Sequence, residues 1–262
     1  MKLMVNHQTH YHYSQPACNS IQYIKMLPQS SAHQRVHYWD ISIPGERCMK
    51  RDVFGNLWIT ATQRFSYSHL SIMSQGVVEL QPHNMGIHQP DVPSYLFLQP
   101  TAMTQWDKNM IEFCQQYVKI GSLSELRCLA EQIFKKVAYS AETTTVQTSA
   151  QDAFYAGVGV CQDHAHLMIA LCRALGLPAR YVSGYLFDQN TPHLASHAWA
   201  EVWLSQQWHC FDISNQLFDP TSHIYVAIGR DYLDVAPRPW YARTRWCRNH
   251  AIHCSSACLL EI

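Results

Sequence analysis

The strongest apolar pattern in the chain runs from Leu167 to Leu175, where polar positions almost disappear. Gly176 and Pro178 follow it, and a glycine after the last helical residue with a proline just beyond is a stop signal. The run therefore predicts a buried helix. A flexible Gly-x-Gly segment at residues 157–159 leads into it, so Cys161 is expected at or near its first turn.

Three further helices are predicted before this one. The first begins after Thr104 and ends at Gly121, with apolar residues three or four positions apart. The second follows a capping box formed by Ser122 and Glu125. A short third helix is expected over residues 149–156. We expect the first two to cover a core, not to carry function.

Strand periodicity replaces helix periodicity after Pro178. Residues 179–187 read as one strand, and residues 196–204 alternate so that His197 and Trp199 share a face. A polar break precedes residues 208–213, which predicts a hairpin, and residues 224–228 read as another strand. Helices followed by antiparallel strands indicate an α+β layout.

The first 81 residues predict a different structure. Residues 36–43 alternate, and an Asp-Val-Phe-Gly-Asn turn at 52–56 leads into residues 57–62. Residues 65–80 have room for two more strands. Several short strands between turn signals predict a small all-β sandwich.

These patterns divide the chain into four parts. Residues 1–81 form the β-sandwich-like domain, and residues 82–103 contain four prolines and predict a linker without regular helix. Residues 104–245 form the α+β domain. Residues 246–262 form a tail rich in cysteine and histidine.

Composition limits the classes of protein that remain. The 262 residues are 47% apolar and 15% charged, and 19 basic residues balance 19 acidic ones. This composition suits one large or two modest domains with real cores and gives no support for binding nucleic acid. No segment is apolar over enough residues to be a signal peptide or to cross a bilayer, so we expect a cytoplasmic protein with reduced cysteines and no membrane partner.

The candidate chemistry centres on Cys161. Unpaired N–H groups and the positive end of the dipole at a helix start favour a thiolate, which is the form that attacks carbonyls. A nucleophilic cysteine needs a base and a group that orients the base. His197 is the candidate base and Asp212, on the neighbouring strand, is the candidate orienting group. Asp219 is the weaker competitor because Asp-Pro is typical of a turn.

Four motifs in order make the chain familiar. They are Gly-Val-Cys-Gln-Asp at 159–163, Leu-Gly-Leu-Pro-Ala-Arg-Tyr-Val-Ser-Gly-Tyr-Leu at 175–186, Ser-His-Ala-Trp-Ala-Glu-Val-Trp at 196–203, and Phe-Asp at 211–212. With Tyr-x-Tyr-Ser-Gln-Pro near the start, the chain resembles the bacterial transglutaminase-like family of papain-like cysteine enzymes from about residue 8 to 245. The resemblance implies a papain-like/transglutaminase-like core whose nucleophile is Cys161, base His197 and third member Asp212.

The resemblance also implies acyl transfer from an amide of a peptide or protein substrate, through a thioester and with no cofactor. We expect hydrolysis, which would make the protein a peptidase or amidase. Transfer to an amine, as in a transglutaminase, is the alternative with the same triad, and a non-catalytic peptide-binding module is a further one. For the β-domain we expect a packing and docking role, and shaping of a substrate groove is the alternative.

The tail raises one more alternative. Dense cysteine and histidine can bind zinc, but the spacing here fits no paired Cys-x-x-Cys pattern. We therefore expect no metal site, and either a loosely ordered tail or plain packing, with a zinc-dependent interaction protein as the remaining alternative. The residues concerned are Cys247, His250, His253, Cys254 and Cys258.

Overall fold

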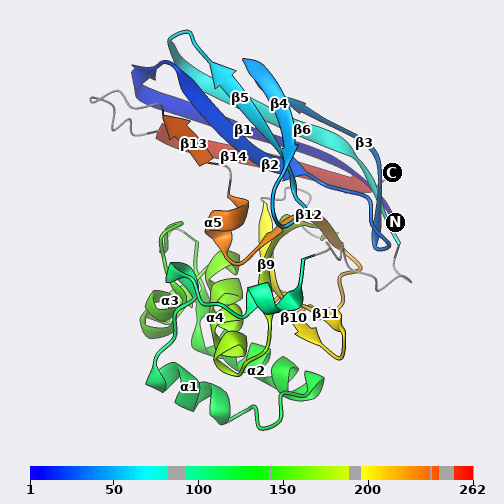
Figure 1. The fold of residues 1–262 in the computed structure, drawn as a ribbon, viewed down its shortest axis with the longest axis vertical. Helices are drawn as coiled ribbons and strands as arrows, with labels where there is room; N and C mark the ends of the chain where they lie inside the picture. Colours follow the sequence, from blue (N-terminus) through cyan, green and yellow to red (C-terminus); the bar gives the residue numbers. More distant parts are fainter. Residues whose placement is uncertain (82–91, 142, 189–195, 237, 242–250, 262) are drawn as a thin grey trace.

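The computed structural model describes residues 1–81, 92–141, 143–188, 196–236, 238–241 and 251–261, with side chains described up to residue 236. Two units are stacked along the long axis of the molecule (Figure 1): a β-sandwich, and below it a unit of helices and strands. No helix in these ranges is long and apolar enough to cross a membrane.

The sandwich consists of two four-stranded antiparallel sheets with strand orders β14-β1-β6-β3 and β13-β2-β5-β4. Its core lies between the sheets and contains Ile24, Ile59, Leu70 and Ile72. The strands are β1 (Lys2–Ala17), β2 (Ser20–Leu27), β3 (Gln34–Ser42), β4 (Glu46–Arg51), β5 (Leu57–Gln63), β6 (Tyr67–Leu80), β13 (Arg238–Tyr241) and β14 (Ala251–Glu261).

The interpretation of residues 65–80 as two strands was wrong, because β6 is one continuous strand. Its buried and partly exposed positions alternate without a break from Leu70 to Leu80. Gly76 lies within the strand. A Cβ at this position would come within 2.3 Å of the Tyr38 carbonyl oxygen, so glycine allows β3 to approach.

The described part of the C-terminal region is a strand, which corrects the expectation of a loosely ordered tail. β14 pairs antiparallel with β1 from Leu3↔Glu261 to Tyr13↔Ala251. An edge strand presents unpaired N–H and C=O groups, and β14 satisfies those of β1. The sequence pattern gave no sign of this pairing because the two strands lie at opposite ends of the chain.

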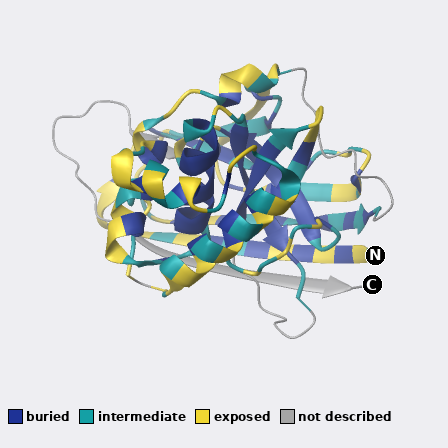
Figure 2. Cartoon of the chain, turned by 90° about the horizontal axis from the view of Figure 1, so that it is seen from below, coloured by how far each residue is buried: buried dark blue, intermediate teal, exposed yellow. Residues whose placement is uncertain are grey.

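The second unit has a four-stranded antiparallel sheet, in the order β11-β10-β9-β12, packed against the central helix α4. Every residue of α4 from Gln162 to Arg173 is buried, whereas the outer helices expose one face (Figure 2). The helices are α1 (Lys108–Gln115), α2 (Leu123–Lys136), α3 (Ala150–Ala156), α4 (Cys161–Ala174) and α5 (Tyr232–Val235). The strands are β7 (Ala138–Tyr139), β8 (Val158–Gly159), β9 (Ala179–Leu186), β10 (His197–Leu204), β11 (Gln207–Phe211) and β12 (His223–Gly229).

The helix signals in the sequence are confirmed. Ser122 Oγ accepts a hydrogen bond from the Glu125 N–H, and the Glu125 carboxylate accepts one from the Ser122 N–H, which is the predicted capping box of α2. Gly176 has φ +77° after the last turn of α4, in the left-handed region that glycine favours. The helix α1 is shorter than predicted. It ends at Gln115, whereas the sequence pattern predicted an end at Gly121.

Arg173 ties the segment between the two units to α4. Its buried guanidinium donates hydrogen bonds to the carbonyl oxygen of Phe97 (2.8 Å), to Thr104 Oγ1 (2.7 Å) and to the carbonyl oxygens of Ala179 and Arg230 (2.9 and 2.7 Å). Residues 92–104 contain only two short 3₁₀ helices, η1 (Ser94–Phe97) and η2 (Ala102–Thr104). The remainder of the predicted linker, residues 82–91, lies outside the described residues.

Two side-chain amides join the sandwich to the open edge of the second sheet. Gln34 Nε2 donates to the Tyr225 carbonyl oxygen while its Oε1 accepts from the Tyr225 N–H, both at 2.8 Å. Asn56 makes the same pair of bonds to Ile228, at 2.7 and 2.8 Å. Tyr225 and Ile228 both belong to β12, so the sandwich fixes the position of this strand.

A buried ion pair crosses the centre of the second sheet. Arg180 Nε donates to Glu201 Oε2 at 2.6 Å, and both side chains are 0% exposed. The Tyr225 hydroxyl donates to Glu201 Oε1 at 2.9 Å, and the guanidinium lies 4.1 Å from the centre of the Trp208 ring. The pair links β9 and β10, the two central strands.

We expect Glu201→Leu to lower the free energy of unfolding by about 3–5 kcal/mol, because it leaves the Arg180 charge buried without its carboxylate. Chemical denaturation followed by tryptophan fluorescence would measure this. The double variant Arg180→Met/Glu201→Leu is the control and should recover much of the loss, because neither charge then remains. A single variant as stable as the wild type would contradict the expected effect of the pair.

Candidate active site

The helix that carries Cys161 begins in a tightly fixed turn. Asp163 Oδ2 accepts hydrogen bonds from the Val160 N–H (2.8 Å) and from Thr144 Oγ1 (2.7 Å). A Cβ at Gly159 would lie 2.8 Å from the Asp163 Cβ, so glycine is needed for this carboxylate to approach the chain. Asp163 thus has the structural role that its position in the first helical turn indicated.

His197 lies at the start of β10, between the cysteine and the aspartate. Its Nε2 is 2.8 Å from Asp212 Oδ2, and the Cys161 side chain lies close enough to the same imidazole to help raise its pKa. The His197 side chain is 11% exposed and Asp212 is fully buried. The structure therefore brings together the three residues chosen from the sequence. The competitor, Asp219, is exposed.

The electrostatics of the site favour a charged imidazole. Burial by itself lowers the pKa of His197, but the hydrogen bonds to Asp212 and Cys161, together with their charges, raise that pKa to about 10. Burial also opposes the charge on Asp212, yet hydrogen bonds from His197 and His223 outweigh it and hold the pKa of this carboxyl well below its ordinary value. Each group thus stabilises the charged form of the other.

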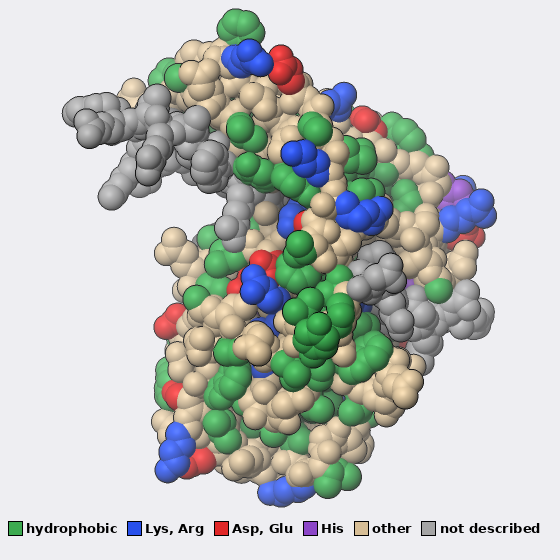
Figure 3. All heavy atoms as spheres, viewed as in Figure 1, with side chains coloured by type: hydrophobic (Ala, Val, Ile, Leu, Met, Phe, Trp, Pro, Cys, Tyr) green, Lys and Arg blue, Asp and Glu red, His purple; other side chains and the backbone are tan. Residues whose placement is uncertain are grey.

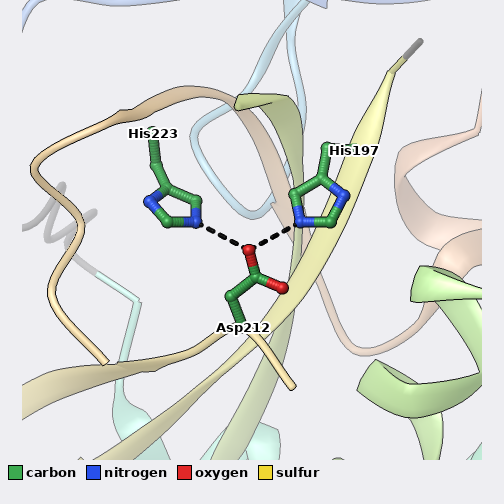
Figure 4. A group of neighbouring side chains, drawn as sticks. All are labelled: His197, Asp212 and His223. Carbon is green, nitrogen blue, oxygen red and sulfur yellow. Dashed lines mark hydrogen bonds and ion pairs between the residues drawn. The ribbon is translucent and has the colours of Figure 1, made fainter. Parts of the chain in front are cut away.

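Asp212 has partners that the sequence did not reveal. His223 Nε2, from the start of β12, lies 3.0 Å from the same Oδ2, so two imidazoles point at one carboxylate oxygen (Figure 4). The Asn215 side-chain amide donates to Oδ1 and Oδ2 at 3.1 and 3.0 Å. Asn215 follows closely in the Phe-Asp segment and could have been suspected. His223 had no such signal among 16 histidines.

Aromatic packing encloses the histidines. Trp199 is 0% exposed, and its ring lies 5.9 Å from that of His197 in a stacked arrangement and 4.7 Å from that of His223. Since Trp199 is fully buried, it packs behind the site and does not line an open channel. His166 accepts a hydrogen bond from the Tyr232 N–H at 3.1 Å, and burial lowers its pKa to about 3, so it is a neutral core residue as expected.

Among the residues with described side chains, one group could hold a metal ion, and it consists of His197, Asp212 and His223. The ligand atoms of His197, Asp212 and His223 lie within 4.8 Å of one another. Both imidazole Nε2 atoms are already hydrogen-bonded to Asp212 Oδ2, so an ion would have to replace these bonds. The cysteine and histidine side chains of residues 247–258 lie outside the described part, and the zinc alternative for them stays a prediction.

The arrangement has a definite chemical capacity. A carboxylate only accepts hydrogen bonds, so the short contact with Asp212 places a proton on His197 Nε2. The other ring nitrogen, Nδ1, is then free to accept the proton of the thiol. A thiol, an imidazole and a carboxylate in this order can form a thiolate–imidazolium pair, the form in which cysteine is a strong nucleophile.

Comparisons with known proteins agree with the fold. Residues 115–213 match the family model described as the transglutaminase-like superfamily, and residues 3–79 match the bacterial transglutaminase-like N-terminal region. The first range includes Cys161, His197 and Asp212.

Two mycobacterial proteins, both uncharacterized, are similar over almost the whole chain. The one from Mycobacterium leprae (strain TN) is 31% identical over 255 residues, which cover 90% of this chain and 91% of that protein. The one from Mycobacterium tuberculosis (strain H37Rv) is 32% identical over 266 residues, which cover 89% and 85%.

Among solved structures, a "Putative Cysteine Protease" from Cytophaga hutchinsonii superposes with a TM-score of 0.78 at 24% identity, covering all of this chain and 91% of that one. At this identity the likeness shows that the two chains share a fold.

We expect Asp212→Asn to lower the pKa of His197 by about 1–3 units, because the variant removes the carboxylate charge that opposes desolvation. Imidazole NMR signals followed against pH would measure it. In the wild type, the pKa of about 10 exceeds the ordinary value of 6.5. The imidazolium therefore stabilises the fold fully below pH 6.5, and the stabilisation is lost as the pH rises through about 10.

Asp219→Asn is the matched control for this experiment. It makes the same chemical change on an exposed aspartate seven positions away and should leave the titration of His197 where it is. Equal titration curves for Asp212→Asn and the wild type would show that Asp212 does not set the charge of the imidazole.

Proposed function

The chain belongs to the transglutaminase-like superfamily, and from this premise we propose that it is a cysteine hydrolase that cleaves peptide or amide bonds through a thioester on Cys161. The observation that carries the proposal is the His197 imidazole, whose Nε2 is hydrogen-bonded to Asp212 and whose pKa is raised by Asp212 and Cys161 together. The raised pKa of His197 agrees with an ion pair at the site.

The proposed reaction begins with proton transfer from the Cys161 thiol to His197 Nδ1. The thiolate attacks the carbonyl carbon of the amide, and the carbonyl oxygen becomes negatively charged. The Cys161 backbone N–H is placed to stabilise that oxygen, because N–H groups in the first turn of a helix have no intrahelical partner. Asp212 holds the tautomer and orientation of the imidazole throughout.

Collapse of this intermediate breaks the C–N bond. His197 gives its proton to the leaving nitrogen, so an amine or ammonia departs and a thioester remains on Sγ. Water then attacks the thioester carbon while His197 takes a proton from it. The C–S bond breaks, a carboxylic acid is released and the thiolate–imidazolium pair is restored. If an amine takes the place of water, the same steps give a new amide.

We propose a peptide or protein as the substrate, as the resemblance to the family implies. On the face shown in Figure 3, lysine and arginine side chains are interspersed with acidic ones, in keeping with 19 basic and 19 acidic residues in the whole chain. Every cysteine whose side chain is described is a free thiol. We propose the cytoplasm as the location because its reducing conditions maintain the thiol that the reaction needs.

We expect Cys161 to react with iodoacetamide at pH 6 much faster than an ordinary thiol of pKa about 8.5. His197→Ala should slow the reaction about tenfold or more, because the thiolate loses its counter-ion. Peptide mapping by mass spectrometry would report the rate at each cysteine. The exposed Cys48 serves as an internal control in the same sample, and its rate should not respond to the mutation. Equal, slow labelling of Cys161 in both proteins would favour a non-catalytic binding module.

Hydrolysis and amine transfer are separated by their products. We expect glutamine-containing peptides incubated with the protein to give cleavage or deamidation, whose masses differ, and Cys161→Ser to abolish both. Adding a primary amine should leave these products dominant. Amine incorporation as the main product would instead assign the protein as a transglutaminase. A wild type that behaves like Cys161→Ser with every peptide would contradict the enzyme proposal.

A further inference from the structure

A cavity of about 360 Å³ lies between the two units, next to the candidate site. The sandwich contributes residues from three of its strands, and the second unit contributes β9, β12, α5 and three residues outside these elements, Val146, Ser196 and Ala236. Figure 3 shows the outline of the molecule indented where these units meet. The volume is at the lower end of the range for sites that bind small ligands or short peptide segments.

The cavity reaches the two backbone neighbours of His197. Ser196, which precedes His197, lines the wall. Gly184, which is paired with His197 on the neighbouring strand β9, also lines it. Directly paired residues of antiparallel strands have Cα atoms about 4.5–5.5 Å apart. The wall therefore starts within one strand spacing of the His197 Cα atom, which places the cavity next to the start of β10.

The lining selects for side chains without charge. Met26, Ile72, Val226 and Val235 are buried apolar residues that face the cavity. The cation in the lining, Lys25, is already neutralised, because its Nζ lies 2.7 Å from Asp52 Oδ2 and also donates to the Asp234 carbonyl oxygen. A charged substrate group placed here would lose its hydration without gaining a free partner of opposite charge.

One polar edge completes the lining. Tyr185 OH lies 2.8 Å from His7 Nδ1, and Thr9 Oγ1 lies 3.2 Å from His7 Nε2. This hydrogen-bonded group joins β1 of the sandwich to β9 of the second unit. The three side chains are buried. The bond between His7 and Tyr185 crosses from one unit to the other, and Thr9 holds the His7 ring in place from the same strand.

We propose that this cavity is a specificity subsite that accepts a large apolar side chain, aromatic or branched aliphatic, of the residue flanking the amide that Cys161 attacks. It rests on the proposed function, since it assigns part of the substrate for the same reaction. It also gives the sandwich a direct part in substrate recognition, which was the less favoured of the two interpretations of the β-region.

The test uses the intact protein and a matched series of peptidyl vinyl sulfones that differ only at the flanking residue, which is Gly, Leu, Phe, Asp or Lys. Labelling rates at Cys161 are measured by peptide mapping. We expect the Leu and Phe probes to react at least about tenfold faster than the Gly probe. The Asp and Lys probes should gain nothing over Gly, because the cavity offers no free charge.

Two pairs of variants locate the preference. Tyr11→Ala removes an aromatic wall on β1, and its control, Tyr38→Ala, removes an exposed ring from β3 of the same unit. Val146→Trp fills the cavity from an exposed loop, and its control, Val53→Trp, adds the same ring at a site that is 81% exposed. The first variant of each pair should reduce the Phe-to-Gly ratio several-fold, and the controls should leave it unchanged.

The outcomes separate this proposal from the proposed function. Equal rates for all probes, or a preference that none of the cavity variants changes, would overturn the subsite even if amides are hydrolysed. Conversely, His197→Ala should slow the reaction of every probe but keep the Phe-to-Gly ratio, because His197 and Cys161 do not line the cavity. A preference for Phe in a protein that hydrolyses no amide would support the subsite and contradict the hydrolase.

Discussion

The structure of the site depends on one buried carboxylate. Asp212 is inaccessible to solvent and remains charged because His197 and His223 donate to the same oxygen while the Asn215 amide spans both oxygens. An isolated carboxylate in such a position would become protonated, because desolvation penalises the charge. The shared hydrogen bonds reverse that balance. In turn, the charge raises the pKa of His197 to about 10 and makes an imidazolium beside Cys161 stable.

The two units cooperate in holding this carboxylate. Asp212 follows β11, His197 begins β10 and His223 begins β12, so the site needs three strands in register. The Arg180–Glu201 pair joins β9 to β10 at the centre of the sheet, and the sandwich holds β12 at its edge. His33 of the sandwich also contacts the His223 carbonyl oxygen at 2.9 Å. The β-region thus supports the site from behind, in addition to the cavity that it lines.

Much of this arrangement could be predicted from local signals. The apolar run, its stop at Gly176 and the alternation around His197 predicted α4 and β10, because each reflects a short-range constraint. The pairing of Cys161 with His197 came from the base that a nucleophilic cysteine needs and from the family resemblance, and not from a local pattern. What failed was long-range. Residues 65–80 were expected to hold two strands where β6 is one. The pairing of β14 with β1 was not predicted, because its partner lies near the other end of the chain. His223 was missed for the same reason, since its role depends on a contact between two strands.

Gln34 and Asn56 carry one more implication. An amide side chain has one donor group and one acceptor group, like a peptide bond. Gln34 and Asn56 therefore each make with β12 the two backbone hydrogen bonds that a residue of a neighbouring strand would make. A carboxylate cannot do so, since it would face the carbonyl oxygens of Tyr225 and Ile228 with a second acceptor. Deamidation of either residue would therefore remove its hydrogen bond to the carbonyl oxygen of β12. The backbone of this edge strand would then be available to pair with another chain. The stability of this sheet edge thus depends on two uncharged side chains that belong to the other unit.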